Sequence, residues 1–264
     1  MQRYALGVEY DGSAYCGWQR QHHSPSVQQA LEEALGHVAD EQVVVNASGR
    51  TDTAVHAWQQ CVHFDTSRVR ELKAWVLGVN AHLPADISVR HATLVSDQFH
   101  ARHSTVGRTY RYVILNHATR SALMHNRAAV VNQPLQERLM HEAAQSLIGE
   151  HDFTSFRAAG CQAKHAVREV TGIAVERFNH HLVVQVEGNA FLQNMVRIIV
   201  GSLVAVGKGE QKPDWIETVL AKRDRTLAGA TAVPQGLFFM GPHYHERFGV
   251  PHWSEYLPHG YWPL

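Results

Sequence analysis

The order of strand-like and helix-like segments constrains this fold most, because that order begins again near residue 107. In the first part, β-branched and alternating runs predict strands, which fall at 3–10, 43–48, 59–66 and 86–95. Apolar residues at helical spacing predict one helix after the capping residue Ser26 and another at 69–83, before Pro84. The polar loop between the first strand and the first helix carries Trp18, which we expect to be exposed.

The second part has a similar content of strands and helices. Its predicted strands lie at 107–116, 168–178 and 181–190, and its predicted helices at 135–149, 190–209 and 213–224. Tyr110 and Tyr112 lie on one face of the first of these strands, since side chains alternate along a strand. Hairpin-like pairs mixed with crossover helices favour an α+β fold with mixed sheets over a doubly wound parallel one. We therefore expect an N-terminal half at 1–106, a C-terminal half at 107–250 and an aromatic tail at 251–264.

Composition indicates an ordinary globular protein of a reducing compartment. Apolar residues make up 45% of the chain and charged residues 18%. The three cysteines, Cys16, Cys61 and Cys161, have no paired spacing, which argues against a disulfide framework. The longest uncharged apolar stretch, at 198–207, is far shorter than the roughly 20 residues that a membrane span requires. No signal peptide precedes the first acidic residues, so we expect a soluble, cytoplasmic protein with no membrane partner.

The charges cancel overall but are unevenly distributed. The chain has 24 basic and 24 acidic residues, which argues against a strongly basic nucleic-acid binder. Between Asp97 and Glu137, however, there is no acidic residue, while five arginines and four histidines fall there. A second acid-free interval at 157–168 adds Arg157, Lys164 and Arg168. Such stripes mark either a surface for a polyanion or ordinary solvated faces, and the residues alone leave both interpretations open.

Several common catalytic motifs are missing from the sequence. There is no GxxxxGK[ST], no strand-linked GxGxxG, no GxSxG and neither HExxH nor CxxC. The 20 histidines suggest a metal, but they cluster only at 22–23, 180–181 and 243–246. Adjacent histidines on loops are usually solvated. We therefore expect no metal site, and the missing glycine-rich loops argue against a nucleotide cofactor.

The segment ASGRTDTAVHA at 47–57 carries the best candidate for a catalytic group, Asp52. A lone loop aspartate is more often a turn or cap residue, but the neighbours favour chemistry. Gly49 allows close backbone approach, and Thr51 and Thr53 can donate hydrogen bonds. Arg50 can keep the carboxylate ionised, since an arginine within roughly 4–6 Å lowers an aspartate pKa by about 1–3 units. An anion held in this way can serve as a nucleophile or a base.

The same segment resembles the active-site motif of the tRNA pseudouridine synthase I family, whose members modify uridines 38 to 40 of the tRNA anticodon arm. Further motifs of that family follow in the expected order along most of the chain: YDGSAYCGWQRQ, RTYRYVILN, GEHDFTSFRA, NAFLQNMVRIIVGSL and DRTLAGATAVPQGLFF. The high histidine content and the tail at 251–264 depart from the pattern.

The resemblance implies a role for four residues. Asp52 matches the catalytic aspartate, which attacks the target uridine at C6 of the base or at C1′ of the ribose; the sequence leaves this choice open. Tyr110 matches the active-site tyrosine that packs on the uracil and handles a proton, although a tyrosine on an alternating strand is by default a core residue. Arg197 matches the arginine that pairs with the aspartate, and a charge on an apolar helix requires a partner. Arg50 is suited to phosphate contact or to holding a flipped nucleotide.

The resemblance also implies an architecture and partners. The family fold consists of two similar α/β halves that share an extended mixed, mostly antiparallel sheet with a central active-site cleft, and its members act as homodimers with one tRNA bridging both subunits. The acid-free intervals supply the residues that we expect to contact phosphate, Arg108, Arg111 and Lys164. Phe153 and Phe191 are expected in the core. Two other function classes stay open: an RNA-binding protein without catalysis and a histidine-dependent metallohydrolase.

Overall fold

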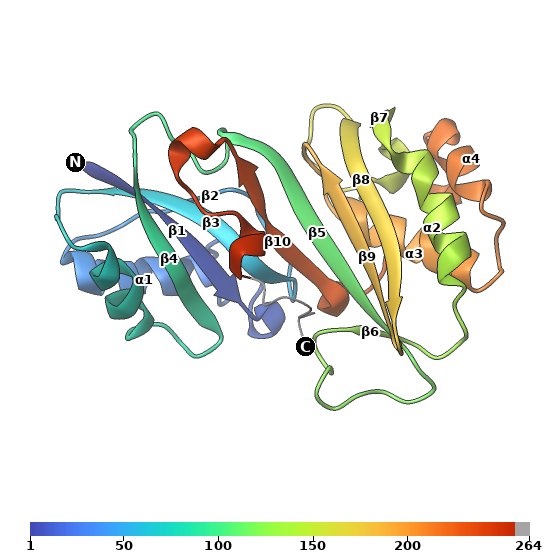
Figure 1. The fold of residues 1–264 in the computed structure, drawn as a ribbon, viewed down its shortest axis with the longest axis horizontal. Coiled ribbons are helices and arrows are strands. Elements are labelled where there is room, and N and C mark those ends of the chain that lie inside the picture. Colours follow the sequence, from blue (N-terminus) through green and yellow to red (C-terminus); the bar gives the residue numbers. More distant parts are fainter. Residues whose placement is uncertain (257–264) are drawn as a thin grey trace. The chain divides into compact units, whose positions relative to one another are not determined.

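The computed structural model describes residues 1–256 and divides the chain into two compact units. The first unit comprises Met1–Val106 and takes up the chain again at Phe238, and the second runs from Gly107 to Leu237. Each unit combines β-strands with helices (Figure 1). The part of the expected aromatic tail beyond residue 256 lies outside the described residues. Among residues 1–256, no helix is long and apolar enough to span a membrane.

The first unit is a mixed sheet with a long helix. Its elements are β1 (Gln2–Tyr10), α1 (Val27–Ala39), β2 (Asn46–Ala47), β3 (His56–Thr66), β4 (Ile87–Val95) and β10 (Leu237–Tyr244). The strand β1 lies between β3 and β4 and is antiparallel to both, while β2 pairs antiparallel with β3 and β10 pairs parallel with it. The pairing of Phe238 with His56 places β10 in the first unit and not in the C-terminal half where we expected it, because a pairing between distant residues leaves no trace in local periodicity.

The second unit repeats the combination of a sheet and covering helices. Its elements are β5 (Thr105–Asn116), β6 (Ala129–Val131), α2 (Glu137–Ala144), β7 (Gly149–Asp152), β8 (Val167–Phe178), β9 (His181–Gly188), α3 (Met195–Gly207) and α4 (Trp215–Lys222). The strands β5, β9, β8 and β7 pair antiparallel in that order, and β6 pairs parallel with β5. Both units therefore confirm the expected α+β class with mixed, mostly antiparallel pairing.

The helix boundaries follow from local backbone chemistry. The side chain of Ser26 accepts a hydrogen bond from the backbone N–H of Gln29, so α1 begins with the expected N-cap. The helix α3 begins five residues later than expected, because Asn194 before it adopts the left-handed conformation with φ 60°. The helix expected at 69–83 is present at residues 72–80, and its central residues Ala74–Gly78 are π-helical.

Two further expectations about the first unit were wrong in detail. Trp18 is buried, with 2% of its surface exposed, and its ring lies 6.0 Å from that of Tyr10. A loop composition does not exclude burial of a large aromatic side chain. The strand expected at 43–48 shrinks to β2, because only Asn46 and Ala47 pair with β3.

Candidate active site

Asp52 lies on the loop between β2 and β3, and its side chain is exposed. Its carbonyl oxygen accepts a hydrogen bond of 3.1 Å from the backbone N–H of Val55. Ala54 between them has φ 61°, a left-handed conformation that costs free energy for any residue with a Cβ. Such conformations persist only where the surroundings fix them and are frequent at functional sites. The turn therefore presents Asp52 to solvent in a defined backbone geometry.

The loop at 15–18 is hydrogen-bonded to the turn that carries Asp52. The backbone N–H of Trp18 donates to the carbonyl oxygen of Thr51 at 3.1 Å, and that of Ala54 donates to the carbonyl oxygen of Tyr15 at 3.4 Å. Gly17 has φ 90°, and a Cβ on it would lie 2.7 Å from the Thr51 oxygen. Close backbone approach therefore requires a glycine at position 17.

The residues around Asp52 differ in part from what the sequence suggested. A Cβ on Gly49 would meet no protein atom within 4 Å, so its freedom is not used for packing. The hydroxyl of Thr51 lies 2.7 Å from the buried phenol of Tyr10, so it helps to anchor the turn to β1. Arg50 is exposed and makes neither a hydrogen bond nor an ion pair within the described part of the chain. A guanidinium in that setting is available to a polyanion.

Tyr110 lies on β5 in the second unit and is half-buried. Its ring packs edge to face against that of Phe191, with centroids 5.0 Å apart and planes at 76°. Phe191 comes shortly before α3 and is itself only half-buried, so it does not belong to the fully buried core where we expected it. The two rings form a partly exposed aromatic pair, and Phe191 is a candidate residue that the sequence analysis left out.

Tyr112, two residues along the same face of β5, has a different environment. It is fully buried, and its hydroxyl donates to the carbonyl oxygen of Val233 at 2.7 Å. Burial raises the pKa of Tyr112 well above its ordinary value, although the nearby Arg197 opposes the shift. Of the two tyrosines on this face, Tyr110 is the one within reach of a ligand.

Arg197 lies in the first turn of α3 and is half-buried. Its Nε donates to the carbonyl oxygen of Ala232 at 2.7 Å and its Nη1 to Oδ1 of Asn194 at 3.0 Å. These bonds use two of the five N–H donors of the guanidinium and fix its plane. The backbone N–H of Ala232 returns a bond of 3.0 Å to the carbonyl oxygen of Arg197, which ties the segment before β10 to the helix.

The three expected phosphate contacts lie in three different settings. Arg108 donates from Nη1 to the carbonyl oxygen of Asn189 at 2.7 Å, on the face of β5 that carries Tyr110. Arg111 lies on the opposite face, where its Nε donates to Oε1 of Gln185 at 2.7 Å and burial lowers the pKa of Arg111. Lys164 is exposed on the loop before β8. Strand alternation therefore separates Arg111 from Tyr110.

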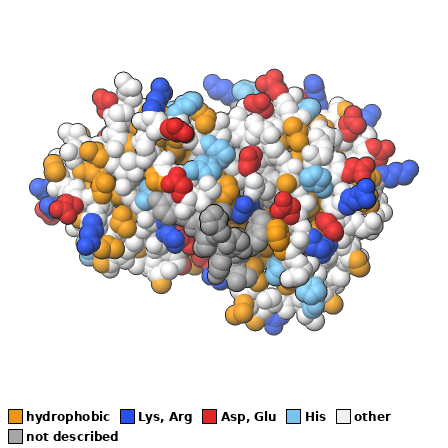
Figure 2. Space-filling view, in the orientation of Figure 1, with side chains coloured by type: hydrophobic (Ala, Val, Ile, Leu, Met, Phe, Trp, Pro, Cys, Tyr) orange, Lys and Arg blue, Asp and Glu red, His pale blue; other side chains and the backbone are white. Residues whose placement is uncertain are grey.

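Charged side chains on the face drawn in Figure 2 are of mixed sign. Lysine and arginine side chains are interspersed with aspartate and glutamate among the coloured residues of each unit. A polyanion would therefore be held there by individual cations and not by one broad basic field.

Several histidines have a backbone role that explains their presence without a metal. The Nδ1 atoms accept hydrogen bonds from backbone N–H groups: His56 from Gly12, His63 from Ala101 and His141 from Val175. An acceptor nitrogen requires the neutral ring. Within residues 1–256, no group of three or more His, Cys, Asp or Glu side chains is arranged to hold a metal ion.

Comparisons with known proteins agree on one family. The family model for tRNA pseudouridine synthase matches residues 7–104 and 143–245. The tRNA pseudouridine synthase A of Photobacterium profundum is 50% identical over 249 residues, which is 94% of this chain and 95% of the relative. The enzyme of the same name from Hydrogenovibrio crunogenus is 51% identical over 247 residues, 94% of each chain. That of Vibrio cholerae serotype O1 is 49% identical over 249 residues, again 94% of each chain.

Proposed function

This chain belongs to the tRNA pseudouridine synthase family, and from that membership we propose that it isomerises uridines 38 to 40 of the tRNA anticodon stem-loop, with Asp52 as nucleophile. The observation that carries the proposal is the position of Asp52. It is exposed on a turn whose backbone is tied to Trp18 and Tyr15. A reactive group that is accessible but fixed in this way meets the geometric demand of nucleophilic catalysis.

The reaction balances without a cofactor. The Asp52 carboxylate adds to C6 of the uracil or to C1′ of the ribose, and the bond between N1 and C1′ breaks. The uracil rotates and a bond forms between C5 and C1′, and the bond between the Asp52 oxygen and C6 or C1′ breaks, so that the carboxylate is released. The proton on C5 then leaves and N1 gains one, so that no oxidant, reductant or energy source is consumed. The protein must therefore supply a nucleophile, a group that handles the proton and a surface that holds the detached base.

Tyr110 is our candidate for the surface that holds the detached base and for the group that handles the proton. A uridine inside a stem must be unstacked and extruded, which costs a few kcal/mol. An aromatic face that receives the base offsets part of that cost, since a base stacked on an aromatic side chain contributes about 1–3 kcal/mol. The half-buried pair of Tyr110 and Phe191 offers such a face, with a phenol hydroxyl on the same ring.

We assign Arg197 to Asp52 as its charge partner. The guanidinium is already oriented by Ala232 and Asn194, so little entropy is lost when it meets a carboxylate. The pairing completes the active site that the family fold implies. We propose that Arg50, Arg108 and Lys164 contact tRNA phosphate. Arg111 lies on the other face of β5 and is not assigned to phosphate, and its own substitution tests this. A homodimer in the cytoplasm, bridged by one tRNA, is the proposed working form.

One assay separates this function from its rivals. Unmodified tRNA is incubated with the purified protein and EDTA, and its nucleosides are then analysed for pseudouridine at positions 38 to 40. We expect isomerisation with chelator present. Tight binding without any pseudouridine favours an RNA-binding protein without catalysis, and activity that appears only after metal is added favours a metal-dependent enzyme.

A further inference from the structure

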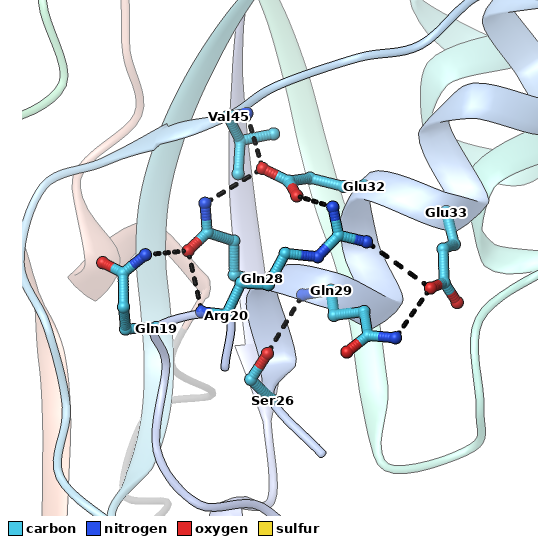
Figure 3. Close-up of polar contacts among 8 residues, drawn as sticks. All are labelled: Gln19, Arg20, Ser26, Gln28, Gln29, Glu32, Glu33 and Val45. Atoms are coloured by element: carbon cyan, nitrogen blue, oxygen red, sulfur yellow. Dashed lines mark hydrogen bonds and ion pairs between the residues drawn. The ribbon is translucent and has the colours of Figure 1, made fainter. Parts of the chain in front are cut away.

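Two polar side chains of α1, Gln28 and Glu32, are buried at the centre of a hydrogen-bond network in the first unit (Figure 3). Only 9% of Gln28 and 6% of Glu32 is exposed. Burying an amide and a carboxylate costs free energy unless each finds partners. Because burial of these two polar side chains costs free energy, we looked for a role of the network other than packing of α1.

The carboxylate of Glu32 is held by three donors. Its Oε1 accepts from Nε2 of Gln28 at 2.9 Å and from the backbone N–H of Val45 at 3.1 Å. Its Oε2 lies 3.2 Å from Nη1 of Arg20. The carboxylate thus links α1 to the segment before β2 on one side and to the loop before α1 on the other (Figure 3).

Gln28 connects the Glu32 carboxylate to the loop before α1. Its Oε1 accepts from Nε2 of Gln19 at 2.8 Å and from the backbone N–H of Arg20 at 3.1 Å. The backbone N–H of Gln28 also donates to the carbonyl oxygen of Trp18 at 3.0 Å. Because Nε2 is bonded to Glu32, the amide cannot rotate without breaking one of these bonds.

The loop in turn contacts the turn that carries Asp52. The carbonyl oxygen of Trp18 is bonded to Gln28, and the N–H of the same residue is bonded to the carbonyl oxygen of Thr51. Both backbone groups of Trp18 are therefore fixed, one by α1 and one by the residue before Asp52. The side chains of Glu32 and Gln28 therefore hold residues 19 and 20, and the adjoining Trp18 connects this part of the loop to Thr51.

We propose that Gln28 and Glu32 are positioning residues for the nucleophile: their side-chain bonds hold the loop at residues 19–20 and, through it, the adjoining Trp18 backbone, which contacts the residue before Asp52. The inference rests on the proposed function, in which Asp52 attacks the uridine. Neither residue touches the reacting atoms. A displacement of about 1 Å in a reacting group can cost on the order of a hundredfold in rate, so loss of this support should slow chemistry more than binding.

A direct contact with RNA is the rival explanation. Gln19, Arg20, Gln28 and Glu32 also line an open hollow of about 640 Å³. If RNA binds in that hollow through Gln28, its loss weakens tRNA affinity. If Gln28 acts through the loop, its loss lowers the rate at saturating protein and leaves affinity nearly unchanged.

The test is the variant Gln28→Leu, measured by single-turnover pseudouridine formation at saturating protein and by the Kd for tRNA. We expect the rate constant to fall on the order of tenfold or more, with Kd within about twofold. The matched control is Gln29→Leu. Gln29 is the next residue of α1 and makes the same type of bond, from Nε2 to Oε1 of Glu33 at 2.9 Å, but that bond is exposed to solvent. The control should keep the wild-type rate.

Three further variants protect the test against a folding defect. Glu32→Gln keeps an oxygen acceptor for Gln28 and Val45 and should retain the rate within a few-fold, whereas Glu32→Leu should behave like Gln28→Leu. If the leucine variants melt before assay temperature, Gln19→Ala removes one exposed donor to Gln28 and should lower the rate about two- to threefold at unchanged Kd.

Three results would overturn the inference: an unchanged rate in folded Gln28→Leu, an equal loss in Gln29→Leu, or a loss confined to Kd. Absence of pseudouridine with the wild-type protein would instead defeat the proposed function. The two failures are therefore distinguishable.

Discussion

The backbone N–H of Trp18 lies 3.1 Å from the carbonyl oxygen of Thr51, one residue before Asp52. Trp18 is almost fully buried, so this bond ties the Asp52 turn to the interior of the first unit. The contact depends on Gly17, whose φ of 90° and lack of a side chain let the two loops approach. The backbone of Gly17 and Trp18, in the loop before α1, thus helps to fix the position of the candidate nucleophile.

We expect Gly17→Ala to lower both stability and activity. The new Cβ would lie 2.7 Å from the Thr51 oxygen at a backbone conformation that alanine rarely adopts, at a cost of about 1–3 kcal/mol. Urea unfolding and single-turnover rates measure the two effects. The control is Gly49→Ala, where the new Cβ meets no atom within 4 Å. The free energy of unfolding of this control should change by less than about 0.5 kcal/mol. Wild-type stability and rate in Gly17→Ala would contradict the account of this contact.

The salt dependence of tRNA affinity tests the phosphate contacts one at a time. Each lost phosphate contact should reduce the slope of log affinity against log salt by about 0.7–0.9. We expect this reduction for Arg108→Gln and for Lys164→Gln. Arg111→Gln should leave the slope unchanged, because Arg111 lies on the other face of β5 and binds Gln185. A reduced slope for Arg111→Gln would place RNA on that face as well.

Stability should fall as the pH drops below about 6.5, in part because of His63. Burial, with His100 nearby, lowers the pKa of His63 to about 4, and its Nδ1 accepts from Ala101 only when the ring is neutral. The unfolded state then binds the proton first. The contribution of His63 is therefore fully present above pH 6.5 and is lost as pH falls towards 4, by at most about 3 kcal/mol.

Urea unfolding of His63→Gln over this pH range measures that contribution. The glutamine can keep an acceptor for Ala101 but does not titrate, so its stability should depend less on pH than that of the wild type. His125→Gln, at an exposed position, should retain the wild-type dependence. Identical pH profiles for His63→Gln and the wild type would show that another group is responsible.

A double-mutant cycle tests the pairing of Arg197 with Asp52. Arg197→Met also loses the bonds to Ala232 and Asn194 and should destabilise the protein by itself. If the two side chains interact, combining it with Asp52→Asn should cost less than the sum of the single changes, by about 0.5–3 kcal/mol. The control cycle uses Arg177→Met, because Arg177 binds Glu137 and the carbonyl oxygen of Leu135. Additivity in both cycles would reject the pairing.

Local signals predicted much of the fold, and long-range pairing explains most of what they missed. Ser26 marked the start of α1, and alternation through Tyr110 and Tyr112 marked β5, because caps and periodicity are properties of neighbouring residues. The pairing of β10 with β3 joins residues far apart in sequence, and the burial of Trp18 depends on packing against the Tyr10 ring.

The candidate site likewise contains some residues that the sequence indicates and others that only the structure reveals. Asp52 could be chosen from its local sequence, and the family pattern indicated roles for Arg50, Tyr110 and Arg197. Phe191 could not be distinguished from a core residue, since only the structure places its ring against Tyr110. The roles of Gln28 and Gly17 were also hidden, because each depends on contacts with residues outside its own segment that only the structure shows.

The most direct test of the central claim is single-turnover pseudouridine formation by Asp52→Ala on unmodified tRNA, with tRNA affinity measured in parallel. We predict no detectable pseudouridine and a Kd within a few-fold of the wild type, because binding rests mainly on phosphate contacts. Asp97→Ala, at another exposed aspartate, should keep wild-type activity. Detectable turnover by the purified Asp52→Ala protein would contradict the account, because the carboxylate could not then be the nucleophile.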